Sequence, residues 1–440
     1  MKTSTISPTC PYCHKPVTEA SDAVMCPICR STHHRTCWQH GDGCQAEGCI
    51  KTDITPLEVQ GEEAPPPTNV PVKRKSSLPW FIGGGIIVLL VLTAMLAVSL
   101  GANPKTVLVI AVVVAALTFD YVNGMHDAGN AIATVISTRV LTPVAALAMA
   151  AVLNLLGALV HAGVAASIAT KFAAPTVDPT TITPIMILCG LIGASIWSFA
   201  TARLGIPVST SHSLFGGLIG VFLLGGVKLN AEYIEKLGLW MVLAPLMAFT
   251  VGWALMVLLM WIFRKMSPHK INRHFRVWQL FSSALMAFSH GSNDAQKAMG
   301  IITMALLSGG FIHFAAGAPV VIPIWVKVAC AMVIAVGTGI GGMRVIRTLG
   351  HKIIKLDPIH GFTAETVAAT TIQIVTLLKI PISTTHIISS SILGIGASKR
   401  LSAVRWGVAI NIVMAWVFTI PACVLSGALL YSFVKLFGLH

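Results

Sequence analysis

Apolar stretches long enough to cross a lipid bilayer recur almost without pause from Pro79 to the end of the chain. A helix needs roughly 20 apolar residues to span the hydrocarbon core, and about eleven candidate spans can be counted here. Only 10% of the 440 residues are charged, against roughly 25% in a soluble globular domain. The sequence therefore predicts an all-α polytopic membrane protein.

Basic residues lie mainly between the apolar stretches. Lys and Arg total 30 against 16 acidic residues, a net charge of +14, and so basic a chain raises the question of a nucleic-acid partner. The basic residues gather in short segments such as 73–75 and 264–276, which is how cytosolic loops orient a multi-pass protein. We therefore expect a lipid bilayer, and no nucleic acid, as the partner.

The N-terminal part is polar up to Pro79 and lacks the early apolar run of a secretory signal. The N-terminus is therefore expected in the cytosol, and the chain in the cell inner (cytoplasmic) membrane. Composition predicts a Cys/His-rich domain at 1–50, a disordered linker at 51–78 and an additional transmembrane helix at 79–101, and the repeated motifs described below divide the rest into two copies of one unit at 105–264 and 276–440.

The apolar segment 105–138 contains a run of polar residues and glycines where lipid-facing side chains are expected. Ionisable groups at membrane depth are costly, so they usually face a cavity or a partner. This run predicts a helix that is broken near its middle. Its members are Asp120, Asn123, Gly124, His126, Asp127, Gly129 and Asn130.

Two motifs occur twice and in the same order. GMHDAGNA at 124–131 corresponds to GSNDAQKA at 291–298, which pairs Asp127 with Asp294, and LGIPVSTSH at 204–212 corresponds to LKIPISTTH at 378–386. The first copy reaches the cytosol at Arg139, whereas the second copy starts from the basic loop 264–276, so the two copies are inverted. An inverted repeat with broken helices and re-entrant hairpins is the architecture of alternating-access transporters.

The proline and hydroxyl residues of the second motif suit the first turn of a helix. Free backbone N–H groups and the positive end of the helix dipole attract an anion there. Helix capping alone would also explain the hydroxyl groups, but their duplication favours an anion site. The candidate residues for this anion site are Ser209, Thr210, Ser211, Ser383, Thr384 and Thr385.

Acidic residues beside such an anion site imply a bound cation or proton. Asp127 and Asn130 lie on one helical face and suit sodium, magnesium or a proton. The second copy has Lys297 in place of Asn130, and an ammonium group cannot coordinate a metal; it is expected to pair with Asp294. These features favour proton coupling, or co-transport of a metal-phosphate complex, over a symmetric scheme with two sodium ions. The candidates for cation or proton coupling are Asp127, Asn130, Asn293, Asp294, Lys297 and Glu365.

Three titratable residues have open roles. Glu365 suits a proton carrier or a structural carboxylate equally well. His212 and His386 stand at mirrored positions and fit structural partners of the hairpins better than proton relays.

Longer segments around these motifs carry a family resemblance. With NGMHDAGNAIATVISTR at 123–139, FSHGSNDAQKAMG at 288–300 and AWVFTIPA at 415–422, the chain resembles the inorganic phosphate transporter (PiT) family, specifically its bacterial low-affinity Pit-type permeases. The resemblance covers roughly residue 108 to the C-terminus. It implies that Asp127, Asn130 and Asp294 lie at cation or proton sites and that Ser209, Thr210, Ser383 and Thr384 contact phosphate. Sodium-coupled members carry Asn at the position of Lys297, so this sequence is similar to the proton-linked branch.

The resemblance and the motifs together predict secondary active transport of inorganic phosphate, by proton or metal-phosphate symport through alternating access. H⁺ is favoured as the coupling cation and Na⁺ is the alternative. An enzyme is not expected. A sulfate carrier of the same fold stays open, as does a membrane-anchored zinc-finger adaptor whose transporter fold serves as scaffold. A homodimer and a protein partner of the N-terminal domain are also left open.

The N-terminal domain contains eight Cys and His residues with the spacing of metal ligands, enough for two tetrahedral zinc sites. A disulfide framework is disfavoured in the reducing cytosol. The order resembles a prokaryotic RING-type zinc finger, in which alternate pairs share a metal. That resemblance implies one zinc ion at Cys10, Cys13, His34 and Cys37, and another at Cys26, Cys29, Cys44 and Cys49. His33 is an alternative to His34 that spacing does not exclude.

Overall fold

The computed structural model describes residues 9–13, 15–17, 22–26, 31–40, 44, 57–58, 103–314 and 319–438. The chain divides into two compact units, Met1–Ser77 and Leu78–His440, which are described here one at a time. The transmembrane helix predicted at 79–101 lies outside the described residues.

The N-terminal unit contains a small antiparallel sheet and one short helix. Strands β1 (Ala23–Met25), β2 (Thr32–His34) and β3 (Leu57–Glu58) form a sheet in the order β2-β1-β3, and helix α1 spans Arg35–His40. Because β3 pairs with β1, this domain extends past residue 50. The predicted start of the linker at residue 51 was therefore too early.

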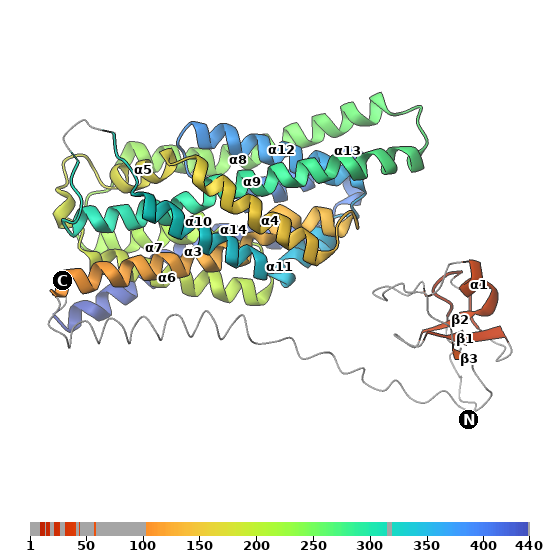
Figure 1. Cartoon of the computed structure of the whole chain (residues 1–440), viewed down its shortest axis with the longest axis horizontal. Helices are drawn as coiled ribbons and strands as arrows, with labels where there is room; N and C mark the ends of the chain where they lie inside the picture. The colour runs from red at the N-terminus through yellow and green to blue at the C-terminus, as the bar shows by residue number, and fades with distance from the viewer. Residues whose placement is uncertain are drawn as a thin grey trace. The chain divides into compact units, whose positions relative to one another are not determined.

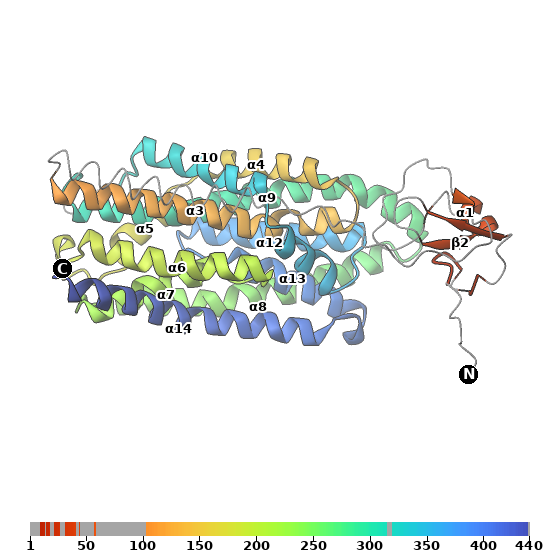
Figure 2. The same cartoon turned by 90° about the horizontal axis from the view of Figure 1, so that it is seen from below.

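The second unit is a bundle of helices that lie side by side along its long axis (Figures 1 and 2). Most of the long helices begin with a proline in the first turn, where its missing N–H costs nothing. The helical elements are α3 (Pro104–Ser137), α4 (Pro143–Val160), α5 (Gly163–Lys171), η2 (Pro179–Thr181), α6 (Pro184–Leu204), α7 (Thr210–Leu224), α8 (Ala231–Ile262), α9 (Pro268–Ser308), α10 (Ile324–Ile340), α11 (Met343–Arg347), η3 (Thr348–Lys352), α12 (Pro358–Leu377), α13 (Thr384–Lys399), η4 (Leu401–Ala403) and α14 (Trp406–Leu436).

Fewer of these helices qualify as membrane spans than the sequence predicted. Among the described residues, five helices are long and apolar enough to cross a membrane, or six if α10 and the segment Met343–Lys352, bent by 60°, form one span. Several of the apolar segments that we counted belong to shorter helices; α7, for example, has 15 residues. The count of about eleven therefore exceeds the number of spans in the described chain.

Helix α3 runs without a break through the polar run that was expected to interrupt it, and α9 does the same over 41 residues. The motif glycines explain this correction, because each one lies against the backbone of another helix. A Cβ atom at Gly124 would come within 2.4 Å of the Ile334 carbonyl oxygen on α10, and one at Gly291 within 2.2 Å of the Asn154 carbonyl oxygen on α4. The glycines thus permit close helix packing rather than a break.

The packing of the bundle repeats with the partners exchanged. Helix α3 packs on α10 while α9 packs on α4, and α7 packs on α14 while α13 packs on α8. The Arg276 guanidinium, near the start of α9, donates to the Arg139 carbonyl oxygen just after the end of α3, with a distance of 2.8 Å from Nη2. The two central helices are therefore antiparallel, as an inverted repeat requires.

Two helical hairpins enter the bundle from opposite ends of α9. Helices α6 and α7 pack together around the turn 205–209, and α12 and α13 around the turn 378–383. Gly361, near the start of α12, lies against Gln279 in the first half of α9. At the base of the other hairpin, the Asn230 backbone N–H donates to the carbonyl oxygen of Phe172, which directly follows helix α5. Helix α5 packs against Gly300, in the second half of α9. The bases of the two hairpins therefore lie near opposite ends of α9.

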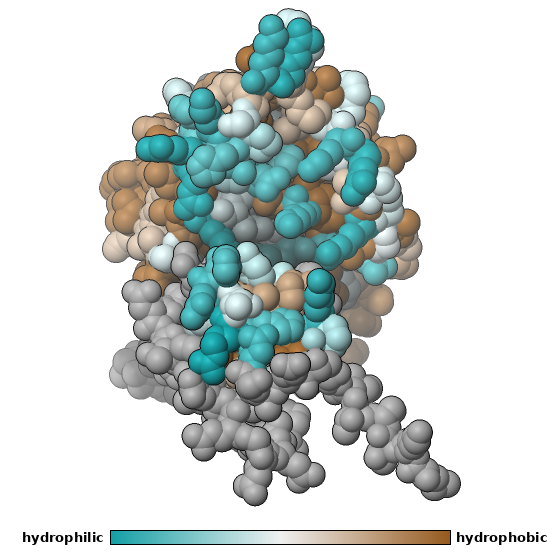
Figure 3. Space-filling model, turned by 90° about the vertical axis from the view of Figure 1, so that its right-hand side faces the viewer, coloured by the Kyte–Doolittle hydropathy of each residue, from teal (hydrophilic) through white to brown (hydrophobic). Residues whose placement is uncertain are grey.

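The end of the bundle that carries Arg139 and Arg276 has a hydrophilic surface, while hydrophobic side chains cover its flanks (Figure 3). The exposed basic residues of the connections between helices include Arg264, Lys265, Arg344, Arg347, Lys352, Lys355, Lys399, Arg400 and Arg405. Such a basic end above apolar flanks fits the side of a membrane protein that faces the cytosol.

Candidate functional site

The tips of the two hairpins meet in the middle of the bundle. The hydroxyl of Ser211, on the first tip, donates to the Ile382 carbonyl oxygen of the second tip at 2.8 Å. The rings of His212 and His386 lie 4.4 Å apart, centroid to centroid. The structure therefore brings the two duplicated helix starts together, although 174 residues separate them in sequence.

Each tip begins its helix with a serine cap. The Ser209 hydroxyl oxygen accepts from the His212 backbone N–H at 3.1 Å, and the Ser383 oxygen accepts from the His386 N–H at 3.2 Å. Capping therefore occupies an oxygen lone pair of each serine. The hydroxyl hydrogen of each serine stays able to donate to an anion.

Asp127 on α3 receives hydroxyl groups from both tips. Thr210 Oγ1 lies 3.1 Å from Asp127 Oδ2, and Thr385 Oγ1 lies 3.4 Å from Oδ1. The adjacent His126 places Nδ1 2.6 Å from Oδ1 and Nε2 3.2 Å from the Ile206 carbonyl oxygen, in the turn before α7. One buried carboxylate, 1% exposed, is thus linked to both hairpins.

Asn130 contacts the second hairpin through its amide nitrogen. Nδ2 donates to Thr385 Oγ1 at 2.9 Å and to Thr384 Oγ1 at 3.2 Å. The amide oxygen has no hydrogen-bond partner among the described residues. The nitrogen turned toward the hydroxyl groups is a donor, which suits anion binding better than metal coordination.

Asp294 on α9 pairs with a lysine side chain. Lys297 Nζ lies 2.8 Å from Asp294 Oδ1, and both side chains are buried. Thr384 Oγ1 approaches Asp294 Oδ2 at 3.5 Å, and the neighbouring Asn293 donates to Thr376 Oγ1 at 2.8 Å. The second copy therefore places an ammonium group beside its aspartate, whereas the first copy places an imidazole.

One arrangement of side chains in this region matches the spacing of metal ligands. The ligand atoms of Asp127, His290 and Asp294 lie within 4.8 Å of one another. We do not assign a metal site there, because the Lys297 ammonium lies 2.8 Å from one of these carboxylates. A fixed positive charge at that distance strongly opposes a second cation.

Glu365 lies in a separate polar cluster. Its carboxylate accepts from Thr134 at 2.5 Å, from Gln279 at 3.2 Å and from the hydroxyl of Ser282. None of these partners belongs to the duplicated motifs, so the structure does not bring Glu365 to the hairpin tips. Three donors on one buried carboxylate are typical of a satisfied structural group.

The candidate site residues chosen from the sequence left out three polar residues near the site, although Asp120 and His126 were noted as members of the polar run. His126 and His290 lie beside the two aspartates, with His290 Nε2 3.6 Å from Asp294 Oδ2. Asp120 is fully buried, and neither of its carboxylate oxygens has a hydrogen-bond partner in the described chain. Its spacing of seven residues from Asp127 puts both on one face of a continuous helix. That signal is readable in the sequence once α3 is taken as unbroken.

His386 packs between the tips and α14. Its ring stacks on Trp416 at a centroid distance of 3.9 Å, and Trp416 Nε1 donates to the Pro207 carbonyl oxygen at 3.0 Å. Both nitrogens of His212 lack a hydrogen-bond partner in the described part of the chain. The contacts of His386 are those of a packing residue at the hairpin tips.

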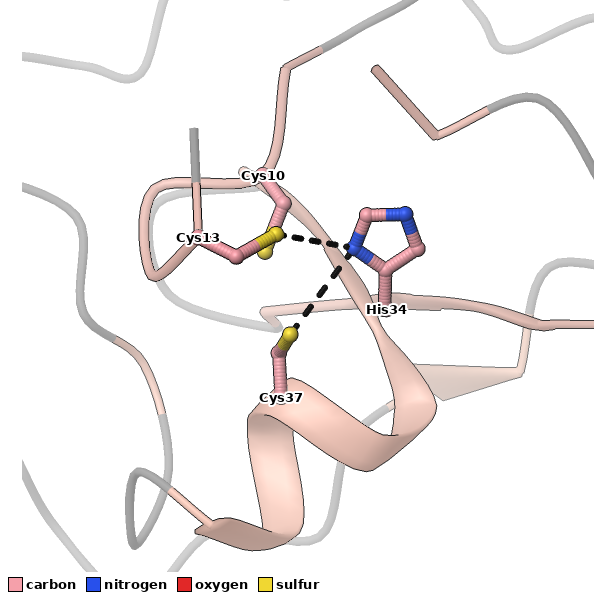
Figure 4. A group of neighbouring side chains, drawn as sticks. All are labelled: Cys10, Cys13, His34 and Cys37. Atoms are coloured by element: carbon pink, nitrogen blue, oxygen red, sulfur yellow. Dashed lines mark hydrogen bonds between the residues drawn. The ribbon is translucent and has the colours of Figure 1, made fainter. Parts of the chain in front are cut away.

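The N-terminal unit contains a second candidate site, with the chemistry of a metal centre. Figure 4 shows the sulfur atoms of Cys13 and Cys37 facing Nδ1 of His34, at 3.4 and 3.8 Å, with Cys10 beside them. The ligand atoms of all four residues lie within 4.8 Å of one another, a donor set that fits tetrahedral zinc. Burial raises the pKa of Cys10, but hydrogen bonds from Cys13, His34 and Tyr12 outweigh it and lower that pKa to about 6.

The other four predicted zinc ligands are only partly described. Cys26 and Cys44 are buried in a small core with Val24 and Trp38, whereas Cys29 and Cys49 lie outside the described residues. His33 points away from the first cluster, with Nε2 3.4 Å from the Cys44 sulfur. Of the two adjacent histidines, His34 is therefore the one that joins Cys10, Cys13 and Cys37.

The inverted hairpins, the buried site and the apolar helices define a helical membrane transporter. The fold is similar to that of a solved structure titled "The sodium-dependent phosphate transporter", with a TM-score of 0.68 and 24% identity over 75% of this chain and 99% of that chain. The family model described as "Phosphate transporter family" matches residues 123–270 and 264–427. This chain therefore belongs to the phosphate transporter family.

Curated relatives agree with this assignment. A "probable low-affinity inorganic phosphate transporter" of Rhizobium meliloti (strain 1021) is 42% identical over 74% of this chain and 96% of its own length. A protein of the same description from Bacillus subtilis (strain 168) is 41% identical over 75% of this chain and 98% of its own length. The family and these relatives are transporters and not enzymes.

Proposed function

We propose that this protein carries inorganic phosphate across the cytoplasmic membrane together with protons, by alternating access to one site between the hairpin tips. The observation that carries the proposal is the meeting of two hydroxyl-rich helix starts around the buried Asp127. Helix starts and hydroxyl groups are the donors that bind a tetrahedral oxyanion without a full compensating charge. The names of the relatives support phosphate as that oxyanion.

Burial of the site supports alternating access. The six candidate hydroxyl residues are at most 5% exposed, and the two tips are hydrogen-bonded to each other through Ser211. An anion can reach these groups only if the tips separate or tilt. Because the hairpins enter from opposite ends of the bundle, movement of one tip would open the site toward one side of the membrane and movement of the other tip toward the opposite side.

The charges of the buried groups support proton coupling. The described residues bury four carboxylates, those of Asp120, Asp127, Asp294 and Glu365, but a single lysine or arginine, Lys297. A phosphate anion placed among these groups would add further negative charge in a medium of low dielectric constant. Protons on the acidic groups remove this repulsion. Sodium, or a divalent metal carried with phosphate, is the alternative source of positive charge.

Uptake into proteoliposomes tests the proposal. The purified full chain is expected to accumulate labelled phosphate in sodium-free buffer when the outside is made more acidic than the inside. Asp127→Asn should abolish this uptake, whereas the exposed control Asp178→Asn should keep it. Strict dependence on sodium or on a divalent metal would replace the proton in the mechanism. Stronger competition by sulfate than by unlabelled phosphate would identify a sulfate carrier.

We also propose that the N-terminal domain binds two zinc ions and lies in the cytosol. The cluster of three thiols and an imidazole around Cys10 supports the first ion. A domain of this size has a small core, so a metal would supply much of its folding free energy. Metal analysis of the purified chain should find two zinc ions per chain, and a zinc content near zero would contradict this proposal.

A further inference from the structure

His126 contacts two groups that both accept hydrogen bonds. Its Nε2 lies 3.2 Å from the Ile206 carbonyl oxygen, and its Nδ1 lies 2.6 Å from Asp127 Oδ1. The imidazole is fully buried and the carboxylate is 1% exposed, so water cannot easily replace either partner. Both contacts therefore need a hydrogen atom.

Counting these hydrogens reveals an extra proton. A carbonyl oxygen carries none, so Nε2 must donate its own N–H to Ile206. The contact between Nδ1 and Asp127 needs a second hydrogen, on either atom, but a neutral imidazole has only one N–H. The pair therefore holds one proton more than a neutral histidine beside a carboxylate. We infer that the His126–Asp127 pair is the site at which the coupled proton is bound and released, an inference that rests on the proposed function.

The second copy of the repeat lacks this arrangement. Asn293 stands where His126 stands in the first copy and donates to Thr376 Oγ1 instead. Its aspartate, Asp294, has the Lys297 ammonium at 2.8 Å. Asp294 therefore has an ammonium group at close range, and the His290 imidazole lies farther away, with Nε2 3.6 Å from Asp294 Oδ2. Asp127 instead has the His126 imidazole at its Oδ1, so this asymmetry places the exchangeable proton in the first copy.

Several other titratable and charged groups surround the pair. Asp120 lies on the same helix, and the charges of His290 and Lys297 act on Asp127 from α9. Among the described residues they are Asp120 on α3, His290, Asp294 and Lys297 on α9, His212 on α7 and His386 on α13. Lys297 is engaged by Asp294 rather than by Asp127, so it does not take the place of a proton at the His126–Asp127 pair.

The same proton links the aspartate to the first hairpin tip. Once the proton leaves, the neutral imidazole has a single N–H and can satisfy either Ile206 or Asp127, but not both. If the imidazole keeps its hydrogen bond to Asp127, the turn before α7 loses the hydrogen bond between Ile206 and His126. If the imidazole keeps its hydrogen bond to Ile206, the lone pair of Nδ1 faces the Asp127 carboxylate at short range. Loss of the proton therefore weakens the contact that holds the α6–α7 tip against α3.

The number of protons moved per phosphate tests this inference in the intact chain. In proteoliposomes with a pH-sensitive dye inside, His126→Asn, which gives the first copy the residue of the second, is expected to carry one proton fewer per phosphate than the wild type. The exposed control His269→Asn should keep the wild-type ratio. An unchanged ratio in His126→Asn would overturn the inference. If the wild type takes up no phosphate at all, the proposed function fails instead.

A measurement that needs no transport tests for the extra proton directly. It applies if the wild type takes up no phosphate or if His126→Asn does not fold. Met125–His126 is the one Met–His dipeptide in the chain, so carbonyl-¹³C methionine with uniformly ¹³C,¹⁵N-labelled histidine assigns the backbone amide of His126 by NMR and, through its side-chain carbons, the two ring nitrogens. We expect an imidazole with both nitrogens protonated at neutral pH, or else an infrared band of a protonated carboxyl group that Asp127→Asn removes. An imidazole with one N–H, together with no such band, would refute the extra proton.

Discussion

Replacing Lys297 by asparagine tests the charge balance of the site most directly. The change removes the single buried ammonium and gives the second copy the amide that Asn130 provides in the first. At the observed 2.8 Å, two unit charges attract by about 6 kcal/mol for an effective dielectric constant near 20. Removal of one partner from buried ion pairs costs about 3–5 kcal/mol. The variant would therefore leave Asp294 with a large uncompensated charge.

We expect Lys297→Asn to restore neutrality by binding one more cation at Asp294. In sodium-free proteoliposomes, the ratio of protons to phosphate should rise by one relative to the wild type, and sodium should stimulate uptake. This change in the proton-to-phosphate ratio is opposite in sign to the decrease expected for His126→Asn. Lys270→Asn, the same change at an exposed position of the same helix, should leave the ratio unchanged.

Stability provides an independent readout of the same variant. Removal of the ammonium leaves the buried Asp294 carboxylate without its ion-pair partner, so the thermal stability of the variant is expected to lie below that of the wild type. If the proton ratio, the sodium response and the thermal stability all match the wild type, the argument that Lys297 replaces a coupling cation is wrong.

Three further predictions concern packing, Glu365 and the N-terminal domain. Gly291→Ala should lower the free energy of unfolding by about 1–3 kcal/mol, because the added Cβ would clash with the α4 backbone. A Cβ at Gly238 would meet no atom within 4 Å, so Gly238→Ala should not lower this free energy. Equal melting temperatures of the two variants would contradict the packing argument. Glu365→Gln should lower the free energy of unfolding by about 1–3 kcal/mol, because an amide nitrogen cannot accept the hydrogen bond of Ser282. The proton-to-phosphate ratio should stay the same, and a changed ratio would place Glu365 on the proton path. Cys37→Ser should remove one zinc ion per chain by metal analysis, whereas Cys189→Ser, in α6, should remove none; zinc retained at the wild-type level in Cys37→Ser would exclude that ligand set.

Much of the architecture is readable in the sequence. The duplicated motifs predicted two inverted copies, because the basic residues around Arg139 and in the loop 264–276 must lie on one side of the membrane. The structure places Arg139 against Arg276 at one end of the bundle. The Pro-hydroxyl motifs predicted helix starts, and α7 and α13 begin at Thr210 and Thr384. These features follow from local chemistry, namely turn geometry, capping and the cost of moving charge across lipid.

Other features depend on which helices pack together. The polar run around Gly124 suggested a broken helix, since glycine and buried charge are common at breaks, but the same residues serve a continuous helix when α10 approaches closely. The short pairing of β3 with β1 extends the N-terminal domain past residue 50, and a two-residue strand has no clear signature before its partner is known.

The sequence by itself determined the membrane class, the inverted duplication and the set of polar residues available for transport. The tertiary structure decided how these residues are paired. It joined the tips at Ser211, linked Asp127 to both tips through Thr210 and Thr385, and sent Glu365 to a separate cluster, whereas the pairing of Lys297 with Asp294 was already expected from the sequence. Spacing along a helix defines a face, but the partner of a buried charge comes from another part of the chain or from a rotamer that packing selects. The cost of leaving such a charge unpaired then determines where protons must bind.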